Sequence, residues 1–434
     1  MSSRWRRATC LAGAVCLATA IAPIPAADAQ SRCTGTAASS PDLMAVPTVA
    51  ERVLRFRDAW PMSNGAGVTI AIIDTGVADH PRLGGVADGG DVTGGAGAFH
   101  DCDAHGTFVA GLAAGRPGDD SFAGVAPGAR VLSIRHTTGE EGTLASLASA
   151  VDSAVGQGAR VINISLTSCA PPGMVPPGAP EITAAVQRAE ESGAVVVAAS
   201  GNIGGECPDG AVAWPAILDE VIAVTAVDLP GDPGARHADE PDAVDHAPAG
   251  YAVAADWVDV AAPGGPVAGP SPNGETWADL HVNGSNATPI VGTSFAAPLV
   301  SGTAALILSR APETSPARVR ELILATASPA PSTIGVGAGI VDPVAAVART
   351  GIDSVAVAGA GAVAVAGEDA ATGEDASAGP HAAAPPTPAA RVDHAPTHRI
   401  MAIALLTAVA VIGRALWLAG ASSPVRERTG PSPW

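Results

Sequence analysis

Residues 68–76 have the sequence VTIAIIDTG, a largely apolar run that ends in an acidic residue and turns at a glycine. A continuous apolar run suits a parallel strand covered on both faces, because a strand with one face in water would alternate polar and apolar residues. Comparable runs occur further along the chain, at Val131–Arg135, Arg160–Leu166, Ala194–Ala199, Val221–Val227 and Trp257–Ala261. We therefore expect a sheet whose strands are largely buried.

Helix-like segments lie between and after these runs, at Gly106–Ala114, Leu144–Val155, Pro180–Glu191, Ser294–Ser309 and Pro316–Ala327. Alternation of strands and helices predicts an α/β fold, with a mostly parallel sheet and helices on both of its faces. Sheets of this kind place their functional sites at the carboxyl ends of the strands. The residues that follow each apolar run are therefore the first candidates for a site.

An acid and a histidine stand at two such positions. Asp74 ends the first apolar run within AIIDTGV, where a carboxylate can be partly buried and still face a site. His105 opens a predicted helix with the sequence HGTFVAG, and an imidazole is the natural general base near neutral pH. Each signal is weak alone, because many α/β proteins carry an acid at a strand end and a lone histidine usually has no catalytic role.

An amide and a hydroxyl complete the set. Asn202 follows the run VVVAASG, and its side-chain amide could donate a hydrogen bond to an oxyanion, although an Asn after Gly is also a common turn residue. Ser294, in GTSFAAP, stands at the start of a predicted helix, where unpaired N–H groups and the helix dipole favour negative charge. A plain N-cap serine is the alternative for that position.

The order of the four residues is more specific than any one of them. They occur as Asp74, His105, Asn202 and Ser294, and the order Asp, His, Ser is that of the subtilisin arrangement rather than the trypsin or α/β-hydrolase arrangement. A chance match of all four contexts, in this order and within one α/β domain, is improbable. The pattern predicts a serine endopeptidase with an Asp–His–Ser triad.

From about Trp60 to Val347 the chain resembles the subtilase family of serine proteases, in the motifs IIDTGV, HGTFVAG, AASGN and GTSFAAP and in the segments AGVAPGA and VINIS. The resemblance implies that Ser294 is the nucleophile, that His105 is its base and later acid, and that Asp74 orients the imidazole. It also implies an oxyanion hole formed by Asn202 and the Ser294 N–H. A peptide substrate is expected to pair with Ile164, Ser165 and Leu166, and neither a cofactor nor a metal is expected. The chain departs from the family at Ala104, where the histidine motif usually has a glycine.

Both ends of the chain have the features of targeting segments. Residues 1–29 combine three arginines, a short apolar run and small residues before a cleavage position, which predicts a signal peptide, with an uncleaved anchor as the alternative. Residues 399–421 form an apolar stretch long enough to span a bilayer, with a buried helix as the alternative. Arginines after this stretch place the tail, residues 422–434, in the cytoplasm and the catalytic domain outside the cell membrane.

The rest of the chain divides into three parts. Residues 30–59 form an N-terminal extension too short to build a core of its own, and residues 60–350 form the predicted protease domain. Residues 351–398 are rich in Ala, Gly and Pro, which predicts a disordered linker. The chain has 42 acidic and 23 basic residues, and a balance this acidic argues against a nucleic-acid partner, which would need a basic patch.

Four cysteines remain after removal of the signal peptide, and an even number in an exported protein favours two disulfides. Three pairings are possible; we favour Cys33 with Cys102, which would attach the extension beside the histidine motif, and Cys169 with Cys207, which would join loops that follow two neighbouring strands. Asp101 and Asp103 flank Cys102, and we expect them in a solvated loop rather than at a calcium site.

Within the subtilases, the chain resembles the mycosins, the membrane-anchored subtilases of type VII secretion systems. The resemblance lies in the short extension, the four cysteines, the C-terminal anchor and the strings DCDAHGTFVAG, VINISLTSC and WVDVAAPG. That resemblance implies a protease on the periplasmic side of the cell membrane, with protein substrates and the membrane components of the secretion complex as partners. Two alternatives stay open. The chain could be a structural subunit in which cleavage is secondary, or an anchored subtilase unrelated to secretion.

Overall fold

The computed structural model describes residues 35–137, 142–204, 207–208, 210–227, 247–274, 276–283, 285–330 and 334–350. All of them belong to one of the two units into which the chain divides, Met1–Gly367. The predicted signal peptide, linker, membrane span and tail lie outside the described residues, as does Cys33. Within the described ranges, no helix combines the length and apolar character needed to cross a bilayer.

Seven strands of the described chain form one sheet, in the order β10-β9-β7-β5-β2-β4-β3, and every pair of neighbours is parallel. The six predicted apolar runs all contribute a strand to this sheet. The seventh strand, β3, was not predicted because its sequence VADGGD contains two acids and two glycines. The strands are β2 (Thr69–Asp74), β3 (Val86–Asp91), β4 (Arg130–Arg135), β5 (Val161–Ile164), β7 (Val195–Ala199), β9 (Val221–Val227) and β10 (Val260–Pro263).

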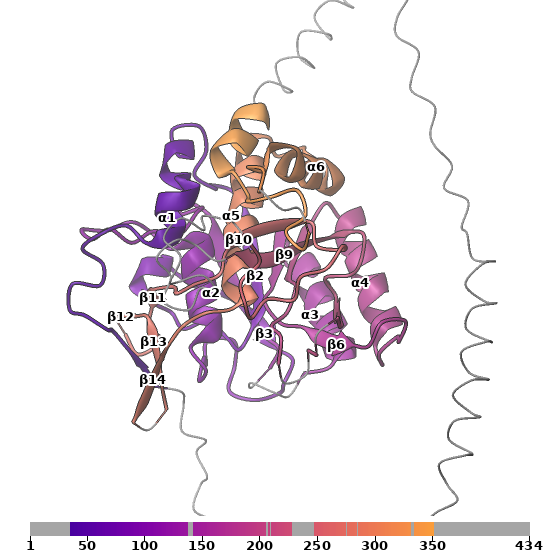
Figure 1. The fold of residues 1–434 in the computed structure, drawn as a ribbon, viewed down its shortest axis with the longest axis horizontal. Helices are drawn as coiled ribbons and strands as arrows, with labels where there is room; N and C mark the ends of the chain where they lie inside the picture. The colour runs from indigo at the N-terminus through magenta and orange to yellow at the C-terminus, as the bar shows by residue number, and fades with distance from the viewer. Residues whose placement is uncertain are drawn as a thin grey trace, which may run out of the picture. The chain divides into compact units, whose positions relative to one another are not determined.

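Successive residues of each central strand point to opposite faces of the sheet, and each face has its own core. In β2, Ile70 and Ile72 pack with the helices α2 (His105–Ala114), α5 (Thr293–Arg310) and α6 (Pro316–Thr326). Ala71 and Ile73 pack on the other side with α3 (Leu144–Gly156) and α4 (Ala179–Glu191). Figure 1 shows α3 and α4 grouped apart from α2 and α5, with the sheet between them. The predicted three-layer α/β architecture is confirmed.

Helix α5 runs through the larger of these two cores and is buried on every side from Thr293 to Leu308. It packs closely against α2. The space at Gly302 shows this, since an added side-chain carbon would stand 2.6 Å from Val125 Cβ and 3.0 Å from the Ala113 carbonyl oxygen. Ala113 belongs to α2, so the glycine allows the two helix backbones to approach. This packing holds the starts of both helices, where His105 and Ser294 lie, in one place.

The described part of the N-terminal extension adds to the domain core. Strand β1 (Gly35–Ala37) pairs with β13 (Leu280–Asn283), which in turn pairs with β14 (Asn286–Pro289). Helix α1 (Val49–Leu54) and the 3-10 helix η1 (Phe56–Ala59) place Ala50, Leu54 and Phe56 in the same core as α5. The remaining elements are η2 (Pro81–Leu83), the pair β6 (Ser168–Ala170) and β8 (Val212–Trp214), and the pair β11 (Gly269–Pro270) and β12 (Trp277–Ala278).

We predict that Gly302→Ala lowers the free energy of unfolding by about 1–3 kcal/mol, because the added carbon would overlap Val125 Cβ and crowd the Ala113 carbonyl oxygen of α2. Urea unfolding followed by circular dichroism measures this change. Gly156→Ala is the matched control, since a carbon at Gly156, the last residue of α3, has no atom within 4 Å. An equal loss in the control would contradict the packing argument.

Candidate active site

The candidate residues come together at the carboxyl edge of the sheet. Asp74 is the last residue of β2, Ser165 directly follows β5, and Asn202 lies three residues beyond β7, so three adjacent strands deliver them. An open cleft of about 490 Å³ at this edge is lined by Thr75, Asp103, His105, Ser165, Leu166, Thr167, His281 and Ser294. The cleft therefore contains the predicted histidine and serine, and the Asp74 side chain lies beneath it.

His105 and Asp74 form the central contact of the site. His105 Nδ1 lies 2.6 Å from Asp74 Oδ1, and the same oxygen accepts the Thr75 N–H at 2.8 Å. A carboxylate can only accept, so the His105 proton resides on Nδ1 and Nε2 is left as the basic nitrogen. Burial by itself would lower the pKa of His105, but the hydrogen bond to Asp74 and the charges of Asp74, Asp101 and Asp103 raise it above its ordinary value. The imidazole is thus stabilised in the charged form that a general base must reach.

Ser294 is the second residue of α5, and its environment is fixed by a proline in the next turn. Pro298 has no N–H to bond the Ser294 carbonyl, so the Ser165 hydroxyl donates to that carbonyl instead, at 2.7 Å. The Ser294 hydroxyl in turn donates to the Ser165 carbonyl at 3.0 Å. These two bonds attach the start of α5 to the segment after β5.

Asn202 is held by the residue that precedes the serine. Its Oδ1 accepts the Thr293 N–H at 3.0 Å and lies 3.2 Å from Thr293 Oγ1. Because the carbonyl end of the amide is occupied, the Nδ2 end remains as a donor. Asn202 is exposed, so this donor is accessible to a ligand, although Asn202 is not itself among the residues that line the cleft.

Asp101 belongs to this site, although we expected it in a solvated loop. Its carboxyl group is buried and accepts the Thr107 N–H at 2.8 Å, the Thr107 hydroxyl at 2.5 Å and the Thr75 hydroxyl at 2.8 Å. Thr75 Oγ1 also accepts the Gly106 N–H at 3.0 Å. Asp101 therefore joins the end of β2 to the start of α2, the two elements that carry Asp74 and His105. Burial, opposed by these hydrogen bonds and aided by the charge of Asp74, raises the pKa of Asp101 to about 6.

The other sequence-predicted residues fall in two groups. Ser165 and Leu166 line the cleft together with Thr167, whereas the Ile164 side chain lies in the core on the α3 and α4 face. His281 of β13 also lines the cleft, and the sequence held no signal for it because a single histidine in a hairpin is unremarkable. Among the described residues there is no group of three or more His, Cys, Asp or Glu side chains that could hold a metal ion.

Cys169 and Cys207 form a disulfide, with 5.1 Å between their Cα atoms, as the sequence analysis favoured. Cys102 is also disulfide-bonded, and its predicted partner Cys33 lies outside the described residues. Ala104 has a φ of 64°, a left-handed conformation that glycine adopts without strain. The chain thus has an alanine in a conformation that favours glycine, the residue expected at this position from the family motif.

The site combines a serine at a helix start, a histidine bonded to a buried aspartate, and an amide donor. This combination, at one edge of a parallel α/β sheet, is that of a serine protease. The chain belongs to the subtilase family, whose model matches residues 65–369. It is 37% identical to mycosin-4 of Mycobacterium tuberculosis over 71% of each chain.

Solved structures give the same result. The crystal structure of MycP1 from Mycobacterium smegmatis is similar, with a TM-score of 0.65 and 31% identity over 73% of this chain and 88% of that chain. A chain in the structure of the periplasmic assembly from the ESX-5 inner membrane complex is similar with a TM-score of 0.64 and 29% identity, over 82% of this chain and 94% of that chain.

We predict that the free energy of unfolding of the wild type falls, relative to Asp101→Asn, as the pH rises from about 4 to 6. The ordinary pKa of the group is 3.8 and its folded value is about 6, so the folded state binds the proton more tightly and loses stability as that proton leaves. The difference between the two proteins should change by up to about 3 kcal/mol over this interval. Urea unfolding at several pH values measures it, and parallel pH curves for the two proteins would contradict the buried, titrating Asp101.

Proposed function

We propose that this protease is an anchored endopeptidase of exported proteins, with Asp74, His105 and Ser294 as its catalytic residues. The observation that carries the proposal is the 2.6 Å contact between His105 Nδ1 and Asp74 Oδ1, in the same cleft as a serine at the start of α5. That contact leaves His105 Nε2 free to accept a proton. For reaction, the Ser294 hydroxyl leaves the Ser165 carbonyl and turns toward this nitrogen.

Each of these groups has one role in the reaction. Ser294 Oγ attacks the carbonyl carbon of the scissile peptide while its proton passes to His105 Nε2, and Asp74 stabilises the resulting imidazolium. His105 then passes the proton to the leaving amine as the peptide C–N bond breaks, which leaves an acyl group on Ser294. A water molecule then attacks the acyl carbon and loses a proton to His105 Nε2. The bond between that carbon and Ser294 Oγ breaks, the proton passes from His105 to Oγ, and the acyl group leaves as a carboxylic acid.

Negative charge develops on the carbonyl oxygen during both steps, and two donors are placed to bind it. The Ser294 N–H is one of the first N–H groups of α5, which have no partner within the helix. The Asn202 Nδ2 group is the second, because Thr293 holds the opposite end of the amide. Donors of this kind lower the barrier because the charge exists only in the transition state and the intermediates.

A test of the triad is the Ser294→Ala variant, which should lower kcat by about 10⁶-fold and lose all labelling by a serine-reactive phosphonate. Mass spectrometry of the labelled wild type should place the adduct on Ser294. Ser149→Ala, which alters an exposed serine on α3, is the control and should keep full activity. Labelling that persists in Ser294→Ala would overturn the assignment of the nucleophile.

We also propose that the protease is held at the cell membrane by residues 399–421, with its catalytic domain on the periplasmic side, and that it associates with membrane components of a type VII secretion complex. The apolar stretch and the arginines after it support the anchor. Similarity to MycP3 from the ESX-3 type VII secretion system, at 34% identity and a TM-score of 0.64, and to a chain of the ESX-5 assembly supports the association.

The alternative role is that of a structural subunit in which protease activity is secondary. The similarity to a chain within the ESX-5 assembly favours this role, and a complementation experiment distinguishes it from the endopeptidase role. In a strain that lacks the gene, we expect Ser294→Ala at normal protein level to leave exported substrates uncleaved, because only catalysis is removed. Immunoblots of culture filtrate and membrane fractions measure cleavage and secretion. Cleavage restored by Ser294→Ala would contradict the proposed endopeptidase, and full rescue of secretion without cleavage would assign the secretion role to the structural subunit.

A further inference from the structure

We infer that the Cys169–Cys207 disulfide is a positioning element for the Asn202 amide, so that its loss lowers turnover through the oxyanion hole. This inference rests on the function proposed above for Asn202. The disulfide lies beside Gly201, which is outside the triad. Its influence passes through this residue, which directly precedes Asn202.

The two cysteines join the two segments that carry groups of the site. Cys169 lies on β6, four residues after Ser165, and β6 is paired with β8. Cys207 lies five residues after Asn202 and is buried; its N–H and carbonyl bond the carbonyl and N–H of Gly204, each at 3.0 Å. The disulfide therefore attaches the loop after β7, which carries Asn202, to the segment after β5, which carries Ser165.

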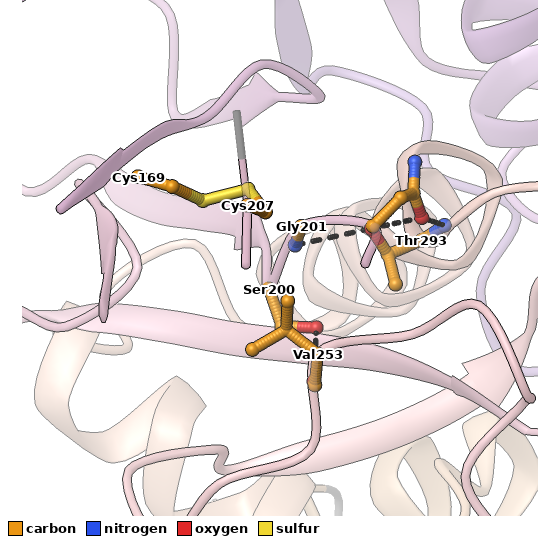
Figure 2. Close-up of a disulfide and its surroundings, with 7 residues drawn as sticks. Cys169, Ser200, Gly201, Cys207, Val253 and Thr293 are labelled. Atoms are coloured by element: carbon orange, nitrogen blue, oxygen red, sulfur yellow. Dashed lines mark hydrogen bonds between the residues drawn. A yellow bond between two sulfur atoms is a disulfide. The ribbon is translucent and has the colours of Figure 1, made fainter. Parts of the chain in front are cut away.

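Gly201 lies between the disulfide and the residue that holds Asn202, as Figure 2 shows. A side-chain carbon on Gly201 would stand 3.2 Å from Cys207 Sγ and 3.6 Å from Cys169 Sγ, so both sulfurs bound the space beside this residue. The Gly201 N–H donates to Thr293 Oγ1 at 3.2 Å, and its carbonyl accepts the Val253 N–H at 2.9 Å. Thr293 in turn binds Asn202 Oδ1.

Loss of the disulfide changes the space that the sulfurs need. Bonded sulfurs are about 2 Å apart, whereas two unbonded thiols require about 3.5–4 Å. Gly201 has a φ of 95°, and both sulfurs bound the space beside its Cα. Thiols that separate would move into this space and shift the residue that sets the direction of Asn202. Oxyanion donors must stand about 2.7–3.1 Å from the developing charge, and a displacement of about 1 Å can lower the rate about 10²-fold.

The decisive experiment is a double-mutant cycle of four proteins, namely the wild type, Asn202→Ala, Cys169→Ser/Cys207→Ser and the triple variant. Asn202→Ala should lower kcat by about 10²–10³-fold. Removal of the disulfide should lower kcat by about 10–100-fold in the wild type but by less than about twofold in the Asn202→Ala background, because the amide that it positions is already absent. Each kcat is measured at a temperature where circular dichroism shows the protein folded.

An equal loss in both backgrounds would overturn the inference, since it would mean that the disulfide acts by general stabilisation. Val186→Ala is the matched control, because it weakens a core contact of α4, on the face of the sheet opposite α5, and should change kcat by the same factor in both backgrounds. A wild type that the phosphonate does not label at Ser294 would overturn the proposed function, whereas normal labelling with additive losses would overturn only the inference.

Hydrogen exchange supplies a readout that does not depend on catalysis or on the folding of the variants. In wild-type protein treated with a thiol reductant, the Gly201 N–H should exchange at least tenfold faster than in the oxidised protein, because its bond to Thr293 is strained by the separating sulfurs. The Arg130 N–H, which bonds the Val68 carbonyl far from both cysteines, is the internal reference and should be unchanged. Unchanged exchange at Gly201 after confirmed reduction of Cys169 and Cys207 would overturn the inference.

Discussion

The site depends on how closely the start of α2 approaches the end of β2. A side-chain carbon on Gly106 would stand 2.0 Å from the Gly76 carbonyl oxygen and 3.1 Å from Asp74 Cβ, so only a glycine allows this approach. The approach brings His105 Nδ1 to 2.6 Å from Asp74 Oδ1. A buried carboxylate is unfavourable unless it is hydrogen-bonded, and the imidazole and the Thr75 N–H both bond its Oδ1, whereas Oδ2 has no hydrogen-bond partner among the described residues. The histidine is thereby held in one orientation and one tautomer before any substrate arrives.

The start of α5 is fixed by side chains that replace a hydrogen bond missing from the helix. Pro298 frees the Ser294 carbonyl, and the Ser165 hydroxyl satisfies it from the segment after β5. Asn163 Nδ2 donates to that same hydroxyl, and the hydroxyl of Ser301, about two turns beyond Ser294 on α5, donates to Asn163 Oδ1. This buried network joins the helix to the sheet at the position of the serine. Stability and the geometry of the site are coupled here, because the groups that satisfy the core also locate Ser294.

Much of the fold was predictable because burial on both faces leaves a clear pattern. The run Val221–Val227 is apolar or small at nearly every position and is β9 with the same bounds. Edge strand β3 has no such pattern, since a strand with a neighbour on one side alone tolerates acids and glycines. Asp101 was misplaced for a related reason. An acid between a histidine and a cysteine is expected in water, and nothing local indicates that Thr75, from a different strand, will cover it.

The sequence by itself determined the fold class, the order of Asp74, His105, Asn202 and Ser294, and the pairing favoured for Cys169 and Cys207, because local pattern and chain order carry that information. Tertiary structure alone decided which atoms meet. It buried Asp101 between the end of β2 and the start of α2, brought His281 from a hairpin to the cleft, and placed the disulfide beside Gly201. These contacts join residues from separate elements, and their distances depend on the packing of α2 and α5 on the sheet, which no local stretch of sequence specifies.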